Sequence, residues 1–135
     1  MRFVSTVKNL GFRLDSQLIF SDQVKALKSS CFHKMRNIAK MRPFLTTKQL
    51  QILIQALVIS SLDYCNALYY GIDSALLNQL QIIQNSACRT IFGLKKRESV
   101  SDHLKRLHWL KVKERIQFKI LLLVYKSLNG QAPDY

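Results

Sequence analysis

Positively charged side chains are the groups of this chain whose type and spacing could do chemistry. Five of them fall within twelve residues: Lys95, Lys96, Arg97, Lys105 and Arg106. Lys and Arg donate charge-assisted hydrogen bonds to phosphate oxygens, so this cluster predicts contact with a phosphate-bearing polymer. A nuclear-import signal or a merely solubilising surface has the same composition, and the cluster alone does not separate these interpretations.

A second group of cations shares one face of a helix predicted for residues 21–42. Ser21 or Asp22 is a suitable N-cap, and Pro43 prevents the helix from continuing beyond Arg42. Its apolar residues recur at helical spacing: Val24, Leu27, Cys31, Met35 and Ile38. At about 100° per residue, the opposite side carries His33 and four cations: Lys25, Lys28, Arg36 and Lys40. No Glu four residues away neutralises them, so this face, together with Arg42, either contacts phosphates or is a solvated basic face with Phe32 packed at its edge.

The charge of the whole chain is unevenly distributed. Its 135 residues include 21 Lys and Arg against 8 Asp and Glu, a formal net charge of +13. Residues 1–48 hold ten cations and two acids, residues 49–88 hold no Lys or Arg, and residues 89–135 hold eleven cations and four acids. A fold gains nothing from such self-repulsion, so we expect a polyanionic partner for the two flanks and a scaffold role for the middle.

Residues suited to other chemistry are scattered. The eight acids include no adjacent Asp pair, and neither a GxxxxGK[ST] loop nor an HExxH motif occurs. His103 and His108 stand five residues apart, off a common helical face, which argues against a metal site. We therefore expect no cofactor, no bound metal and no catalytic activity of this chain by itself.

Cysteine usage and hydropathy indicate where the chain resides. Three widely spaced cysteines fit neither a disulfide framework nor a zinc site and favour a reducing compartment. The most apolar block, residues 120–125, is six residues long between Lys119 and Lys126, whereas a spanning helix needs about 20. We expect no membrane span and an intracellular location, in the nucleus or cytoplasm. The basic, acid-free residues 1–14 resemble a mitochondrial transit peptide only weakly.

Two further segments of the first two thirds of the chain have the patterns of regular secondary structure. Residues 1–15 have the β-branched and aromatic pattern of a short hairpin or edge strands around Asn9-Leu10-Gly11. Thr46 and Gln49 form a capping-box pattern before a helix that is apolar on nearly every side from Leu50 to Leu62, as expected of a central post surrounded by other helices. After the polar Asp63, the segment YCNALYYG ends at Gly71, a predicted C′ glycine.

The next helix is predicted between a cap at Asp73 or Ser74 and a terminal Gly93. Its apolar stripe comprises Leu76, Leu80, Ile83, Ala87 and Ile91. Its other faces carry four amides, Gln79, Gln81, Gln84 and Asn85, which either face water or bind a nucleic-acid backbone or a partner helix. Ser101 is the expected cap of a short helix that carries Lys105 and Arg106.

The final helix is predicted from Val112 to the stop formed by Gly130 and Pro133. Three of its cations, Arg115, Lys119 and Lys126, share one narrow angular sector around the helix axis, so they form a basic strip on an otherwise apolar cylinder. The remaining surface of this helix is therefore predicted to be buried.

The order of several segments resembles the part of LINE-class (non-LTR) retrotransposon reverse transcriptases that follows the catalytic palm. The likeness covers nearly the whole chain. It rests on five runs: VKNLGFRLD, RNIAKMRPFL, SSLDYCNALYYG, LQIIQNSACRTI and LKRLHWLKVKERIQFKILLLVYKSLNGQAPDY. The family pattern LHWLPV has Lys111 in place of proline here, which predicts a looser turn before the last helix.

This resemblance implies that residues 1–19 are a strand region at the palm edge and that residues 20–135 are a thumb-like helical domain with its following helices. The family's metal-binding aspartates lie in an F/Y-x-D-D motif of the palm, and this chain contains no such motif. A thumb-like unit would contact the template-primer duplex. A start at the palm edge suggests a truncated or decayed copy that lacks its upstream palm.

The combined expectation is a mainly α chain, with a bundle of about four to five helices preceded by a short N-terminal hairpin or edge strands. Its expected function is that of a non-catalytic fragment of an RNA-directed DNA polymerase, which binds template-primer nucleic acid without sequence specificity through basic helix faces. The alternative is a structural or protein-interaction helical module with no nucleic-acid role.

Overall fold

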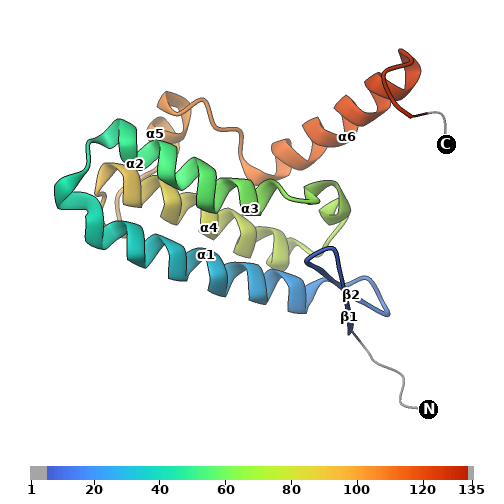
Figure 1. Ribbon diagram of the computed structural model, residues 1–135, viewed down its shortest axis with the longest axis horizontal. Coiled ribbons are helices and arrows are strands. Elements are labelled where there is room, and N and C mark those ends of the chain that lie inside the picture. The colour runs from blue at the N-terminus through green and yellow to red at the C-terminus, as the bar shows by residue number, and fades with distance from the viewer. Residues whose placement is uncertain (1–5, 134–135) are drawn as a thin grey trace.

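The computed structural model describes residues 6–133, within which a two-stranded hairpin precedes five helices, residues 47–63 being counted as one continuous helix (Figure 1). The predicted fold class is therefore confirmed, although Phe3 and Val4 of the expected first strand lie outside the described residues. The elements are β1 (Thr6–Asn9), β2 (Phe12–Asp15), α1 (Ser21–Met41), the 3-10 turn η1 (Arg42–Phe44), α2 (Thr47–Ile54), the π-helical turn η2 (Gln55–Ile59), α3 (Ser60–Asp63), the 3-10 turn η3 (Asn66–Tyr69), α4 (Ser74–Phe92), α5 (Ser101–Arg106) and α6 (Val112–Leu128).

Three long helices form the body of the molecule. α1, the continuous helix α2-η2-α3, and α4 lie side by side, each antiparallel to the one before it (Figure 1). α5 packs at one end of this bundle, and α6 projects beyond the other end. The predicted apolar stripes of α1 and α4 are buried, and they meet the buried residues of α2-η2-α3: Leu50, Ile54, Val58, Ile59 and Leu62.

The hairpin is attached to the bundle by three aromatic rings. Phe12 of β2 lies 5.7 Å from Phe20 and 5.6 Å from Tyr69, measured between ring centroids, and Phe20 lies 6.1 Å from Tyr69. All three side chains are buried. Such aromatic pairs contribute about 0.5–1.5 kcal/mol each beyond the area they bury. A two-stranded hairpin is marginal on its own, so this cluster is what holds it.

The start of α1 differs from the predicted cap. Neither Ser21 nor Asp22 caps the helix; the N-cap residue is Phe20, which is in the left-handed region and makes no side-chain cap. Asp15 organises the approach instead, because its carboxylate accepts hydrogen bonds from the backbone N–H groups of Ile19 (2.9 Å) and Phe20 (2.7 Å). The N-cap pattern in the sequence did not predict these hydrogen bonds, because their acceptor, Asp15, lies six residues before the first residue of α1.

The other helix ends largely follow the sequence pattern. Thr46 and Gln49 form the predicted capping box, the Asp73 carboxylate accepts from the N–H of Ala75 (2.8 Å), and Gly93 ends α4 in the left-handed region. The prediction that Ser101 caps α5 is wrong. Ser101 is the first residue of this helix, and the N-cap residue before it, Val100, makes no side-chain cap hydrogen bond. Gly71 has a positive φ, as its proposed stop role requires.

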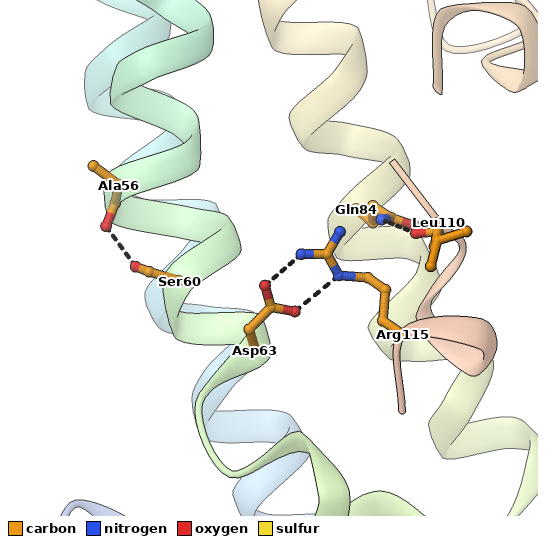
Figure 2. Close-up of polar contacts among 6 residues, drawn as sticks. All are labelled: Ala56, Ser60, Asp63, Gln84, Leu110 and Arg115. Carbon is orange, nitrogen blue, oxygen red and sulfur yellow. Dashed lines mark hydrogen bonds and ion pairs between the residues drawn. The ribbon is translucent and has the colours of Figure 1, made fainter. Parts of the chain in front are cut away.

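The central helix α2-η2-α3 is not surrounded on all sides. Ile52 and Leu57 are exposed, because this helix has neighbours in the bundle on one side only. Its wide π turn takes more residues per revolution than an α turn, and this brings Val58 and Ile59 both into the core. The Ser60 hydroxyl donates to the carbonyl of Ala56 within this stretch (Figure 2).

The largest departure from expectation concerns α6. Only Val112 and Ile116 are buried in this helix, so the prediction that its apolar cylinder is core is wrong. A helix of this length measures about 25 Å, and its second half extends past the end of the bundle (Figure 1). The periodicity was compatible with burial, but no element of residues 6–133 covers this half. None of the helices described in this range combines the length and the apolarity that crossing a membrane requires.

The Asp15 carboxylate provides a pH test of this arrangement. Backbone hydrogen bonds, that from Ile19 foremost, lower the pKa of Asp15 below its ordinary value of 3.8. A lowered folded-state pKa stabilises the fold above pH 3.8, and this contribution is lost as the pH falls through the folded pKa. We expect Asp15→Asn to reduce the urea midpoint at neutral pH and to match wild type well below pH 3.8.

The matched control is Asp102→Asn. The Asp102 carboxylate forms an exposed ion pair with Lys105, in which Oδ1 lies 3.9 Å from the lysine Nζ. This variant should leave the midpoint nearly unchanged throughout. A deficit of Asp15→Asn that stays the same size at all pH values would contradict the role assigned to the Asp15 charge.

Candidate nucleic-acid interface

The four predicted cations of α1 lie along one side of the helix. Lys25, Arg36 and Lys40 are exposed and Lys28 is half-buried. From Lys25 to Lys40 the helix rises about 22 Å. Phe32 packs against the core beside them, which supports the packing interpretation for this ring rather than a stacking role. We define these four cations as the α1 face.

The remaining six predicted cations lie at the end of the bundle where α1 and α4 terminate. Arg42 and Gly93 are far apart in sequence, yet the Arg42 guanidinium packs so closely over Gly93 that an added Cβ there would collide with it. The exposed loop 95–97 begins two residues after Gly93. We define the end cluster as Arg42, Lys95, Lys96, Arg97, Lys105 and Arg106.

Local contacts shape the end cluster without neutralising it. Glu98 accepts the backbone N–H of Lys95 through its carboxylate (3.1 Å), and its carbonyl accepts from the Arg89 guanidinium (3.3 Å). The Arg106 guanidinium lies 5.4 Å from the centre of the Phe92 ring, a cation–π contact that orients it. Lys105 approaches Asp102 at 3.9 Å, with side chains that are 82% and 91% exposed, so this ion pair contributes little.

The acids of the chain explain why these cations stay uncompensated. Four carboxylates bind backbone N–H groups rather than cations: Asp15, Asp73, Glu98 and Glu114. Within residues 6–133, only two acid–cation pairs come within 4.0 Å, and neither involves the α1 face. These four acids thus serve helix and loop ends, and the positive surface remains available to an external anion.

The prediction that Arg115 belongs to a free basic strip of α6 is wrong. The Arg115 guanidinium donates two hydrogen bonds to the carboxylate of Asp63, one of them from Nε at 2.8 Å (Figure 2). The two side chains are 17% and 33% exposed, so the pair is shielded. Arg115 therefore fastens α6 to the end of α3, and only Lys119 and Lys126 of the strip face solvent.

Two of the amides of α4 have a structural role as well. The Gln84 side chain, fully buried, donates to the carbonyl of Leu110 (2.8 Å; Figure 2), and Gln81 accepts the N–H of Val112 (2.9 Å). Glu114 accepts the N–H of Lys111 (2.9 Å). The turn before α6 is held at three successive residues, so it is not the loose connection predicted from the missing proline.

A cleft of about 660 Å³ between the hairpin and the helices was not predicted. Lys8 and Arg13 line it from the hairpin, and hydroxyl groups line it from α1 and α3: Ser30, Ser60, Ser61 and Tyr64. Tyr64 also donates to the carbonyl of Leu10 (2.6 Å), which ties the hairpin tip to the end of α3. None of the ten predicted cations contributes to the described lining.

The cleft and the α1 face are separate surfaces. Ser30 follows Lys25 by five residues, which places it about 140° around the helix. Residues far apart in the chain build the hairpin cleft. The only sequence signals for it were the paired serines 29–30 and 60–61.

The structure offers little to nucleophilic or metal chemistry. Burial raises the pKa of the Cys88 thiol to about 11 and also raises the pKa of Cys31, so both thiols are protonated at neutral pH. Cys65 is exposed. Among the residues that the structure describes, no three His, Cys, Asp or Glu side chains gather as metal ligands. The exposed Lys and Arg side chains of the described surface can bind anions.

Comparison of the chain with protein-family models, with curated proteins and with solved structures found no match.

The Asp63–Arg115 pair can be tested by a double-mutant cycle. Asp63→Ala, Arg115→Ala and the double variant should give a coupling free energy of about 1–2 kcal/mol in urea unfolding, because the pair is shielded and doubly hydrogen-bonded. The same cycle on Asp102 and Lys105 should give less than about 0.5 kcal/mol. Equal coupling in the two cycles would contradict the role of Arg115 as the fastening of α6.

Proposed function

We propose that this chain binds nucleic acid through its phosphates, without sequence specificity, as a non-catalytic thumb-like fragment of a retrotransposon RNA-directed DNA polymerase. The observation that carries the proposal is the disposition of charge. Carboxylates that could neutralise the surface accept backbone N–H groups instead, and the cations of the α1 face and the end cluster stand almost entirely without acid partners in residues 6–133.

The dimensions of the α1 face suit a polyanion. A duplex carries one phosphate charge per about 1.7 Å of its axis, so the roughly 22 Å between Lys25 and Lys40 corresponds to about a dozen charges. The contact of Arg42 with Gly93 brings the end cluster next to the C-terminal end of this face. One duplex lying along α1 would therefore meet both groups.

The hairpin cleft supports a further contact with phosphate. Lys8 and Arg13 supply positive charge, and the Ser30 hydroxyl can donate to an anionic oxygen between them. In the interpretation that follows from the resemblance, the hairpin is the palm-edge region and the bundle is the thumb-like domain. A palm domain, as a partner of this chain, would supply catalysis, and the chain would act in the nucleus or cytoplasm.

A second function, that of a protein-interaction module, is favoured by a different observation. The outer surface of α6 is apolar and exposed, and it has no use in phosphate binding. The two functions use different faces and are compatible with each other.

Salt dependence of duplex binding tests the first proposal. The wild-type association constant for a short duplex should fall steeply as salt rises, because bound Lys and Arg release counterions. The triple variant Lys25→Gln, Arg36→Gln, Lys40→Gln should lower the slope of log K against log salt by about 2–3, on the basis of about 0.9 per phosphate contact. Fluorescence anisotropy at several salt concentrations gives both quantities.

The matched control removes the same charge from α6, as Lys113→Gln, Lys119→Gln, Lys126→Gln. It should keep most of the wild-type slope, because these lysines lie outside the α1 face and the end cluster. Affinity that does not change with salt, or an equal loss of slope in the two triple variants, would contradict the proposed interface.

A further inference from the structure

Ser99 differs from the other hydroxyl residues of the chain in the charges that precede it. It follows Lys95, Lys96 and Arg97 in the loop between α4 and α5. Of all the Ser and Thr residues in the sequence, Ser99 alone has a cation both two and three residues before it. Serine kinases that select basic substrates read cations at such positions with carboxylates of their substrate grooves, by charge-assisted pairing.

The loop between α4 and α5 presents this serine to solvent. Ser99 and the three cations before it are exposed, and they lie outside helices and strands. The backbone N–H and carbonyl of Ser99 make no hydrogen bond with the residues that the structure describes. The substrate groove of a kinase could therefore align this stretch without breaking a helix. Val100 is buried and anchors the loop, so a kinase would approach from the N-terminal side, where the cations lie.

The Ser99 hydroxyl is not committed to the fold. Its oxygen accepts the N–H of Ser101 at 3.4 Å, a long contact, and its own proton is donated to no acceptor within residues 6–133. By contrast, the hydroxyls of Ser60, Ser61 and Ser127 each donate to a carbonyl one turn earlier in their own helix. The Ser99 oxygen is therefore both accessible and free to act as a nucleophile.

We propose that Ser99 is a phosphorylation site for a basophilic serine kinase, and that the phosphate on Ser99 weakens nucleic-acid binding by the end cluster. In the transfer, the Ser99 Oγ attacks the γ-phosphorus of Mg²⁺-ATP, and the bond between that phosphorus and the β–γ bridging oxygen breaks. ADP leaves, and the hydroxyl proton passes to the catalytic base of the kinase. This chain supplies only the acceptor and the cations that mark it.

The new charge would fall among the cations of the end cluster. A phosphoserine carries about −1.5 to −2 charges at pH 7 and three strong acceptor oxygens. Three of the six cations of the end cluster immediately precede Glu98 and Ser99 in the loop, so the phosphate would offset about two positive charges and occupy their donors. This consequence rests on the proposed function, because it needs duplex binding by the end cluster, whereas the phosphoryl transfer itself does not.

Arg89 of α4 gives the phosphate a partner within the chain. Its guanidinium donates to the carbonyl of Glu98 at 3.3 Å, one residue before Ser99. The Arg89 Nε is buried and has no hydrogen-bond partner within residues 6–133. A guanidinium with an unused donor beside the acceptor serine would bind the phosphate by charge-assisted hydrogen bonds. The folded chain could therefore accommodate the modified loop.

Phosphorylation of the full folded chain tests the site. The chain is incubated with Mg²⁺-ATP and a purified serine kinase that selects cations two and three residues before its acceptor. Peptide mass spectrometry should find one phosphate, on Ser99. Ser99→Ala should take up none, while the matched control Ser101→Ala should behave as wild type. Arg97→Gln should lower the kcat/KM of the kinase by about tenfold or more, because it removes a charge-assisted contact. Lys113→Gln, which removes the same charge from α6, should leave kcat/KM unchanged.

Duplex binding of the phosphorylated chain tests the consequence. In fluorescence anisotropy, phosphorylation should lower the slope of log K against log salt by about 1–2, on the basis of about 0.9 per phosphate contact. Ser99→Ala treated with the same kinase and ATP is the matched control and should keep the slope of the unmodified chain.

The outcomes separate the two parts of the proposal and the function on which one of them rests. A wild-type chain that takes up no phosphate, or takes it up on another hydroxyl, would overturn the site. Faster modification of Ser99 by a kinase that selects acidic residues after the serine would also overturn it, since Asp102 would then be the determinant. An unchanged slope after phosphorylation would overturn the consequence. A chain phosphorylated on Ser99 that binds no duplex in either form would overturn the proposed function and the consequence, while the phosphorylation site would stand.

Discussion

The packing of α1 against α4 is the contact on which the rest of the structure depends. The buried stripe of α1 makes its most extensive contact with α4, and this forces the polar side of α1 outward. The same contact places the C-terminal end of α1 beside the C-terminal end of α4, so that Arg42 reaches Gly93. Burial of apolar side chains, worth about 1.5–3 kcal/mol for each large one, thus determines where the cations stand.

Polar contacts attach the outer elements to this apolar body. The hairpin is tied at its tip by Tyr64 and at its base by Asp15, whereas α6 is tied by Gln81, Gln84 and Asp63. Most of these side chains bind backbone groups, whose direction is set by the local chain path. These polar contacts add to the buried aromatic cluster that holds the hairpin and to the buried Val112 and Ile116 of α6, and acids that serve attachments are not available to neutralise the surface.

The body was predictable from sequence and the attachments were not. Regular apolar spacing identified α1 and α4 with their core residues, and the capping patterns at Thr46 and Asp73 gave helix starts, because both signals are local. The end cluster depends on residues far apart in the chain, and the hairpin cleft combines three segments. For the same reason the sequence predicted Arg115 as a free cation, because its partner Asp63 is distant in the chain. The exposure of α6 was not predicted either. Periodicity shows that a helix has an apolar side but does not show what covers that side.

The π turn η2 precedes the residues that anchor both outer elements to the bundle. Both depend on the end of the central helix, where Asp63 binds α6 and Tyr64 binds the hairpin, and both residues follow the turn. A π turn is equivalent to one residue inserted into an α-helix. Because the wide turn accommodates this extra residue within about one revolution, the helix after it keeps nearly the angular phase that an uninterrupted α-helix one residue shorter would have. The same extra residue in a stretch that stayed α-helical would rotate Asp63 and Tyr64 by about 100° relative to the bundle core, so this one backbone irregularity preserves the alignment of both outer elements.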